Sequence, residues 1–355
     1  MAIRRRNHRG KKLKMNSNIT VIVPMYNVEK YIKKCLSSIS DQTYSNFEVF
    51  AINDGSTDKS SIRAKKIAEK DKRIKVIDKE NGGYGSVLEY AIKEIKTEYF
   101  LICDPDDWLE KSCLEKLYIF AKKNNADIVV GDRYDVYVNN EDQKHKSKVK
   151  PDYLVNIKPK EIYSSSNDIQ LFSFFQVSPH AKLYKTNLVR NVKFPKHVSY
   201  TDFLLYMAAL SKAKKVAYYN EPLADYLQDR PGNTATSVRK SIINDYVVVW
   251  NATFLTISDC LYNNILLYRL YVQLRLILSE YNRVIIEGFN NKYWNEIINA
   301  KKLLQKKKED ICIPYFENNI LKRLFFKAFM SKNVSNLAIK LYIKLKKVER
   351  KNING

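Results

Sequence analysis

The run Tyr99-Phe100-Leu101-Ile102-Cys103 leads directly into Asp104-Pro105-Asp106-Asp107-Trp108. The first five residues are apolar and predict a buried strand. Burying the acids unpaired would be costly, so they must lie beyond the strand's carboxyl end, where open α/β sheets bind ligands. Carboxylates suit hard cations such as Mg²⁺ or Mn²⁺, which often hold substrate phosphates. The stretch therefore favours a metal-diphosphate site. The alternative is an acidic turn in which Asp106 or Asp107 caps a helix over 109–123.

Strand and helix patterns alternate over the first 135 residues. Apolar runs predict strands over residues 19–24, 47–52, 74–77, 99–103 and 126–131, and the segments between them show helical spacing. Strands that alternate with helices predict a parallel sheet with right-handed crossovers. We therefore expect the loops that carry Pro24, Asp54, Asn81 and Asp104 to open on one edge of that sheet.

Four motifs, in order, resemble those of the GT-A glycosyltransferases of family 2, which are inverting enzymes that use nucleotide-activated sugars. They are Thr20-Val21-Ile22-Val23-Pro24-Met25-Tyr26-Asn27, Asn53-Asp54-Gly55-Ser56-Thr57-Asp58, Asn81-Gly82-Gly83 and Asp104-Pro105-Asp106-Asp107. The resemblance is strong over residues 19–131 and weaker to about residue 236. It implies an α/β GT-A fold, Rossmann-like, with a mostly parallel sheet flanked by helices.

The same resemblance implies roles for the residues of these motifs. Pro24 and Tyr26 would line the nucleobase pocket, and Asp54 would hydrogen-bond the base or the ribose. The donor site would also contain Asn81, Gly82 and Gly83. Asp104 and Asp106 would form the DxD pair that holds Mn²⁺ or Mg²⁺, with Asp106 the principal metal ligand and Asp104 also contacting the ribose.

Inversion requires a group that takes the proton from the acceptor hydroxyl. The resemblance places this base at Asp202, within Tyr200-Thr201-Asp202-Phe203-Leu204-Leu205, where Thr201 replaces the acid usual in the family. The alternative is an ordinary helix cap at Thr201 or Asp202.

Two later segments resemble the acceptor half of the family. In Ser178-Pro179-His180-Ala181-Lys182-Leu183-Tyr184, a histidine stands where Trp is common, which implies a different acceptor preference. Arg230 lies in a stretch, residues 226–234, that resembles the Tyr-x-x-x-Arg-x-Gly-Ser loop. That likeness implies a bidentate contact from Arg230 to the diphosphate. The alternative is a solvated arginine in a surface turn.

A dinucleotide-binding glycine loop is the rival interpretation of Asn81-Gly82-Gly83-Tyr84-Gly85. That fingerprint follows the first strand and requires G-x-G-x-x-G. The first strand here ends in Pro24-Met25-Tyr26-Asn27, which contains no glycine. The motif therefore argues against an oxidoreductase.

The 355 residues are enough for a catalytic domain and a second unit. We expect a basic tail over 1–17, a GT-A domain over 18–240 and a helical, basic region over 241–355. The GT-A domain would divide into a nucleotide-sugar half, 18–135, and an acceptor half, 136–240, with the polar run 139–150 as a loop between them. Five scattered cysteines predict reduced thiols and a cytoplasmic location. The sequence shows neither the apolar core of a signal peptide nor a run of about 18 apolar residues that would span a membrane.

The net charge is +24, and residues 1–14 and 301–355 together carry +18 of it. Leu321, Leu324, Phe325 and Phe329 form one apolar stripe among lysines and arginines, and Leu337, Leu341 and Leu345 form another. Basic amphipathic helices are typical of segments that lie on anionic membranes. The alternative is a helical bundle with a lysine-rich outer face. Helices over 242–287 would pack on the core or on another subunit, which leaves a homo-oligomer open.

The resemblance implies a cytoplasmic, metal-dependent, inverting glycosyltransferase, which would lie at the inner face of the plasma membrane if its basic helices bind lipid. UDP is the expected nucleotide of the donor, and the acceptor would be a growing cell-surface glycan, free or lipid-linked. A catalytically inactive sugar-nucleotide-binding module is the main alternative. A nucleic-acid-binding protein is disfavoured, because the basic residues avoid the sheet and no basic-aromatic binding module is present.

Overall fold

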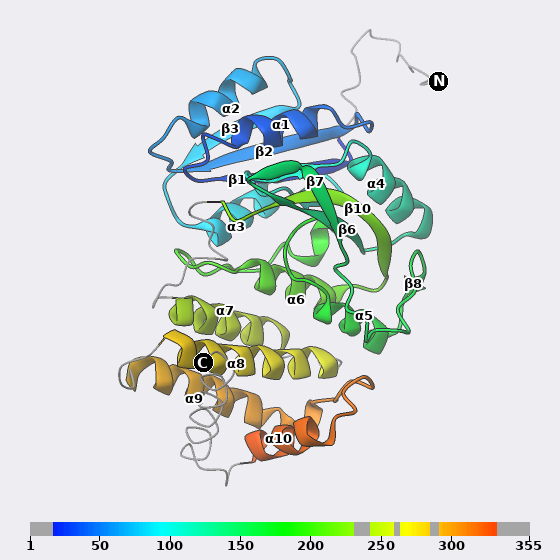
Figure 1. Ribbon diagram of the computed structural model, residues 1–355, viewed down its shortest axis with the longest axis vertical. Helices are drawn as coiled ribbons and strands as arrows, with labels where there is room; N and C mark the ends of the chain where they lie inside the picture. Colours follow the sequence, from blue (N-terminus) through cyan, green and yellow to red (C-terminus); the bar gives the residue numbers. More distant parts are fainter. Residues whose placement is uncertain (1–16, 231–241, 259–262, 285–290, 332–355) are drawn as a thin grey trace.

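The computed structural model describes residues 17–230, 242–258, 263–284 and 291–331 (Figure 1). The first half of the sheet consists of β1 (Ile19–Met25), β2 (Phe47–Asp54), β3 (Ile74–Lys79) and β4 (Tyr99–Ile102). These strands are parallel and lie in the order β3-β2-β1-β4. The helices that connect them are α1 (Ile32–Ser40), α2 (Ser60–Ala68) and α3 (Tyr84–Glu94). The predicted alternation is confirmed, and the predicted loops open on one edge of the sheet.

Both faces of this sheet are covered, which explains why the neighbouring strands β1 and β4 are almost entirely apolar. Val21 and Val23 contribute to a core cluster with α1, α2 and α4 (Cys113–Asn124). Their neighbour Ile22 contributes to a second cluster, on the opposite face, with α3. Because side chains alternate along a strand, a continuous apolar run supplies both cores.

The second half of the sheet is mixed. It contains β5 (Trp108–Leu109), β6 (Ile128–Tyr137), β7 (Asn140–Ser147), β8 (Ile162–Tyr163), β9 (Lys182–Lys185) and β10 (Val216–Gln228), and the helices α5 (Ser166–Leu171) and α6 (Asp202–Lys212) lie between these strands in the chain. β9 runs antiparallel to β4 and β6, and thereby joins the two halves into one ten-stranded sheet. Short 3₁₀ turns occur at Phe172–Phe174, at Thr186–Leu188 and, in the C-terminal region, at Lys308–Asp310. The expected division at 135/136 falls within β6, and the domain limits stay a prediction.

Two local predictions are wrong. The helix expected over 109–123 begins at Cys113, because Trp108 and Leu109 pair with β10 as strand β5. The polar run 139–150, predicted as a loop, is largely strand β7, antiparallel to β6. The sequence pattern did not reveal this strand, because its polar side chains bind other polar side chains. Lys144 Nζ, for example, lies 3.0 Å from Asp225 and also pairs with Glu110. An edge strand needs little apolar surface when its long side chains find such partners.

The C-terminal region is helical, as predicted. It consists of α7 (Ile242–Ile257), α8 (Asn264–Val284), α9 (Asn291–Lys306) and α10 (Ile320–Met330), which stack below α6 in Figure 1. Trp250, Tyr271 and Trp294 belong to the same core cluster as residues of α3 and α6. None of the helices in the described ranges is long and apolar enough to cross a bilayer.

The apolar stripe predicted on α10 is partly buried against the core and partly exposed. Leu321 and Leu324 are 75% and 56% exposed, whereas Phe329 is buried in the core, which corrects the expectation that it faces a membrane. Phe325 is partly buried against the same core. The second stripe, Leu337, Leu341 and Leu345, and residues 1–16 of the basic tail lie outside the described residues.

Candidate active site

The acidic turn lies at the carboxyl edge of β4, as its sequence predicts. The Cys103 N–H donates to the Ile22 carbonyl at 3.0 Å, and the Asp107 N–H donates to the Asp104 carbonyl at 3.0 Å, which closes the turn. Trp108 then enters β5. Backbone bonds on both sides therefore hold the acids in place, and the strand itself carries no buried charge.

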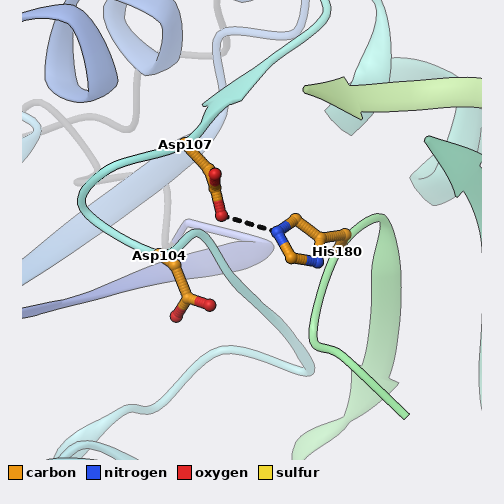
Figure 2. Close-up of side chains that lie close together, drawn as sticks. All are labelled: Asp104, Asp107 and His180. Carbon is orange, nitrogen blue, oxygen red and sulfur yellow. Dashed lines mark hydrogen bonds and ion pairs between the residues drawn. The ribbon is translucent and has the colours of Figure 1, made fainter. Parts of the chain in front are cut away.

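Asp104, Asp107 and His180 form a compact group (Figure 2). One ligand atom from each lies within 4.8 Å of the others. His180 Nε2 is 2.5 Å from Asp107 Oδ2, while Asp107 Oδ1 accepts a hydrogen bond of 2.8 Å from the Leu227 N–H. The alternative role of Asp107 as a helix cap is therefore wrong, since its carboxylate faces β10 and His180, and α4 begins after Ser112.

The acids of this group raise one another's pKa values. Burial and the neighbouring Asp107 and Asp106 charges raise the pKa of Asp104 well above its usual value, and burial and Asp106 raise the pKa of Asp107 likewise. Burial, followed by the positive charge of Arg133, lowers the pKa of His180, so its imidazole is neutral at pH 7. Its Nδ1 is buried and has no hydrogen-bond partner among the residues that the structure describes. Crowded carboxylates beside a neutral imidazole are a donor set that Mn²⁺ or Mg²⁺ could use.

Asp106 points to a different partner. Its carboxylate forms an ion pair with Arg230, although the two residues are 124 positions apart in the chain. The Arg230 side chain is only 18% exposed, and its guanidinium lies 5.5 Å from the centre of the Tyr31 ring. These contacts exclude the alternative of a solvated surface arginine. Residues 231–234 of the resembling loop lie outside the described residues.

The glycine motif is held by Asp54, at the end of β2. The two carboxylate oxygens of Asp54 accept hydrogen bonds from the Gly82 and Gly83 N–H groups at 3.0 and 2.7 Å, and Lys79 Nζ is 2.5 Å from Oδ1. Asn81 Nδ2 donates to the Asp54 carbonyl at 2.9 Å. The motifs of β2 and α3 are thus one structural unit. A direct contact of Asp54 with a base or ribose stays a prediction.

Gly83 explains why this motif requires glycine. Its φ is +82°, and a Cβ atom at this position would lie 2.9 Å from the backbone nitrogen of His197. The His197 N–H donates to the Gly82 carbonyl at 2.8 Å. A larger residue would strain the backbone and push the segment before α6 away from the site.

Pro24 and Tyr26, the predicted nucleobase contacts, differ in exposure. Pro24 is buried in β1 opposite Ile52, whereas Tyr26 is 52% exposed just beyond the strand. Next to it, the Asn27 side chain accepts a hydrogen bond from the Thr57 N–H at 2.9 Å, which ties the first motif to the second. The exposed Tyr26 ring is therefore on the correct edge of the sheet to contact a ligand.

Asp202 is the first residue of α6. Thr201, at the cap position, makes no side-chain capping bond, and burial raises the pKa of Asp202 to about 6. The Asp202 charge also contributes to the raised pKa values of Asp104 and Tyr84, so these groups share one electrostatic environment. Its proposed role as a base is compatible with this position but stays a prediction.

Sequence reasoning missed two contacts of this site. The Tyr84 hydroxyl donates to Asp104 Oδ1 at 2.8 Å, and Asp107 contacts His180. Asp107 was visible as the last acid of the run, and Tyr84 directly follows the glycine motif, but neither pattern indicates a partner. His180 itself packs on the Tyr226 ring, with 4.6 Å between ring centres.

Comparison with known proteins identifies the family. Residues 20–192 match the model of glycosyl transferase family 2. An uncharacterized glycosyltransferase of Haemophilus influenzae is 30% identical over 223 residues, which cover 62% of this chain and 68% of that protein. The chain belongs to glycosyl transferase family 2. Glycosyltransferase GlyA of Streptococcus pneumoniae is 34% identical over 214 residues, 60% of this chain, and the matched part spans only 31% of GlyA.

Solved structures agree with the family assignment at the level of the fold. S. aureus TarS 1–349, in complex with UDP-GlcNAc, superposes with a TM-score of 0.63 at 18% identity and covers 94% of this chain and 92% of that one. This likeness confirms the predicted α/β GT-A fold with its added helical region, and so this family 2 protein has the architecture that its motifs predict.

Proposed function

We propose that this family 2 protein is an inverting glycosyltransferase that moves a sugar from a nucleoside diphosphate, expected to be UDP, to a hydroxyl group of a growing cell-surface glycan. The observation that carries the proposal is the convergence of the Asp104–Asp107 turn, Asp202 and Arg230 at the carboxyl edge of the parallel strands. Open α/β sheets bind their ligands at that edge.

Asp106 and Asp104 would hold Mn²⁺ or Mg²⁺, with Asp107 and His180 beside them. The ion would neutralise the charge that develops on the diphosphate oxygens. Arg230, which pairs with Asp106, would donate to the same oxygens in a bidentate manner. Asp202 would take the proton of the acceptor hydroxyl, which its pKa of about 6 permits at neutral pH.

Transfer assays with a panel of sugar nucleotides test this function directly. We expect one UDP-sugar to raise the melting temperature in the presence of Mn²⁺ and to be consumed when a glycan acceptor is added. Donor binding without turnover on any acceptor would instead indicate an inactive sugar-nucleotide-binding module. Preference for RNA over UDP would contradict the proposal.

Asp54→Ala should weaken UDP binding by a similar factor with Mn²⁺ and with EDTA. The reason is that Asp54 orders the Gly82 and Gly83 backbone but is not expected to contact the metal. Calorimetry of both states measures the effect. Glu48→Ala is the control, because Glu48 lies six residues earlier on the same strand and pairs with Lys75 at 2.6 Å, at the end of β2 that is far from Asp54. A loss seen only with Mn²⁺ would assign Asp54 to the metal.

We further propose that the exposed part of α10 binds an anionic inner leaflet, which would hold a lipid-linked acceptor near the enzyme. Support comes from Ile320, Leu321 and Leu324, which are 73%, 75% and 56% exposed beside Lys322 and Arg323. Attraction to anionic lipid is worth about 1 kcal/mol per basic residue and is screened within about 8 Å at physiological salt.

Leu321→Ser combined with Leu324→Ser should reduce binding to anionic vesicles at low salt and leave UDP binding unchanged. Vesicle sedimentation measures the first quantity and calorimetry the second. Ile62→Ser with Ile119→Ser is the control, since these residues are 57% and 54% exposed on other helices. If the unaltered protein ignores anionic vesicles, or binds neutral ones equally well, the membrane proposal is wrong.

A further inference from the structure

A cavity lies at the edge of the sheet where β4, β6 and β10 begin, opposite the edge that carries Asp104, Asp106 and Asp107. This cavity, of about 610 Å³, is lined by residues just before β4, β6 and β10, including Thr97, Asp127 and Lys215. Asp104 and Arg230, in contrast, follow β4 and β10. The seven positions from Thr97 to Asp104 correspond to roughly 20 Å of extended chain. The cavity is therefore separate from the candidate active site, and nothing in the proposed function uses it.

Both acids that line the cavity already have cationic partners. Glu98 pairs with Lys122 at 2.8 Å, and Asp127 pairs with Lys185 at 3.0 Å. Asp127 is also buried and accepts hydrogen bonds from the Lys214 and Lys215 N–H groups at 2.7 and 3.0 Å. These acids are therefore not free to neutralise further positive charge.

The cations in the lining exceed the acids. Lys212, Lys214 and Lys215 line the cavity, and in the part of the chain that the structure describes their side chains make no hydrogen bond or ion pair. Arg190 also lines it, but its guanidinium donates to the carbonyl groups of Ile92, Lys93 and Ile95 at the end of α3. Three lysine charges thus share one cavity without a carboxylate partner.

Helix polarity explains only part of this arrangement. A lysine at a helix C-terminus is stabilised by the helix dipole, and Lys212 is the last residue of α6. Lys214 and Lys215 lie beyond the helix, where Asp127 binds their backbone N–H groups and sets the course of the chain along the cavity. Lys212 and Lys214 are exposed and Lys215 is half-buried, so this surplus of positive charge is accessible to an anion from solution.

We infer that this cavity binds a ligand that carries two or more phosphate groups. Its volume falls within the range of about 300–1,000 Å³ that is usual for small-molecule sites and exceeds the need of a single ion. Lysines bind phosphate as compact point charges. The same chemistry fits a free oligophosphate or the phosphodiester chain of a polymer, and the test below distinguishes the two.

The test compares a variant with three changes, Lys212→Gln, Lys214→Gln and Lys215→Gln, with the full unaltered chain. The control carries Lys66→Gln, Lys70→Gln and Lys72→Gln. These changes remove the same charge from α2 and from the segment before β3, which is the strand at one end of the strand order. The probes are inorganic triphosphate and a short glycerol-phosphate oligomer, titrated by calorimetry in EDTA. We expect the first variant to bind a probe about tenfold more weakly or worse, the control to match the unaltered protein, and added salt to weaken the binding.

The comparison isolates the cavity from the active site, because neither variant alters a residue at the catalytic edge. UDP binding in Mn²⁺ and the melting temperature should be unchanged in both. Loss of triphosphate binding alone supports a free oligophosphate, and loss of oligomer binding supports a polymer. If the unaltered protein binds neither probe at low salt, or the cavity variant binds both probes as the control does, the inference is wrong.

Discussion

Asp106→Asn is expected to abolish sugar transfer, with a loss of about 10²–10³-fold or more, while the fold remains intact. An amide has the size of the carboxylate but cannot supply a negative charge to a divalent cation. We therefore expect UDP affinity in Mn²⁺ to fall to the value measured in EDTA. Calorimetry in both conditions, together with a transfer assay, measures this. The melting temperature should change little, because the new amide oxygen can still accept a hydrogen bond from Arg230 and the lost charge no longer repels Asp104 and Asp107.

Three companion variants make this result specific. Glu110 is an acid that follows the same turn and pairs with Lys144. Glu110→Gln should therefore leave Mn²⁺-dependent UDP binding unchanged. Asp107→Asn tests the group formed with His180. If Asp107→Asn, and not Asp106→Asn, removes the metal dependence, the metal belongs to that group. Arg230→Gln should weaken UDP binding in EDTA as well. Unchanged UDP affinity of Asp106→Asn in both conditions would exclude Asp106 as a ligand.

Asp202→Asn should bind the donor normally but lose transfer by about 10²–10⁴-fold, the range expected when a general base is removed. Slow hydrolysis of the donor by water is compatible with this result. Single-turnover transfer and UDP-sugar binding separate the two effects. Asp168→Asn is the matched control, because Asp168 is also an acid in the first turn of a helix, α5, but away from the site.

The pH profile gives a second measurement on the same residue. Burial raises the pKa of Asp202 to about 6, so the carboxylate required of a base is present above that pH and is lost as the pH falls through it. Transfer by the unaltered protein should therefore decline below pH 6, and the residual rate of Asp202→Asn should not follow that titration. Full activity of the variant would make Asp202 a structural residue of α6, and His180 would become the next candidate.

The parallel half of the fold could be predicted from local patterns. The apolar runs of β1 to β4 supply both cores of a covered sheet, and charged or glycine-rich segments follow them, so strands and ligand edge are both visible in the sequence. Glycine is required at position 83 for one local reason, its φ of +82°, and one distant reason, the close approach of His197. Patterns of this kind depend on neighbours within a few positions, which is why the Asp54 and Asp104 segments were placed correctly.

The strand β7 and the burial of Phe329 could not be predicted in this way. β7 is polar because its side chains bind partners elsewhere in the fold, and Phe329 lies on a stripe that looked like a free amphipathic face. Periodicity shows which residues share a face of an element. It does not show whether another element covers that face.

By itself, the sequence determined the α/β class and the positions of the parallel strands along the chain. It also determined which residues follow each strand and so lie at the carboxyl edge of the sheet. Only the tertiary structure decided which of those residues meet: Asp106 with Arg230, Asp107 with His180, and Tyr84 with Asp104. The pairs with Arg230 and His180 join segments that are 124 and 73 positions apart, and both depend on where β9 and β10 lie in the sheet. Strand order and register arise from packing between distant segments, so no local pattern of residues encodes them.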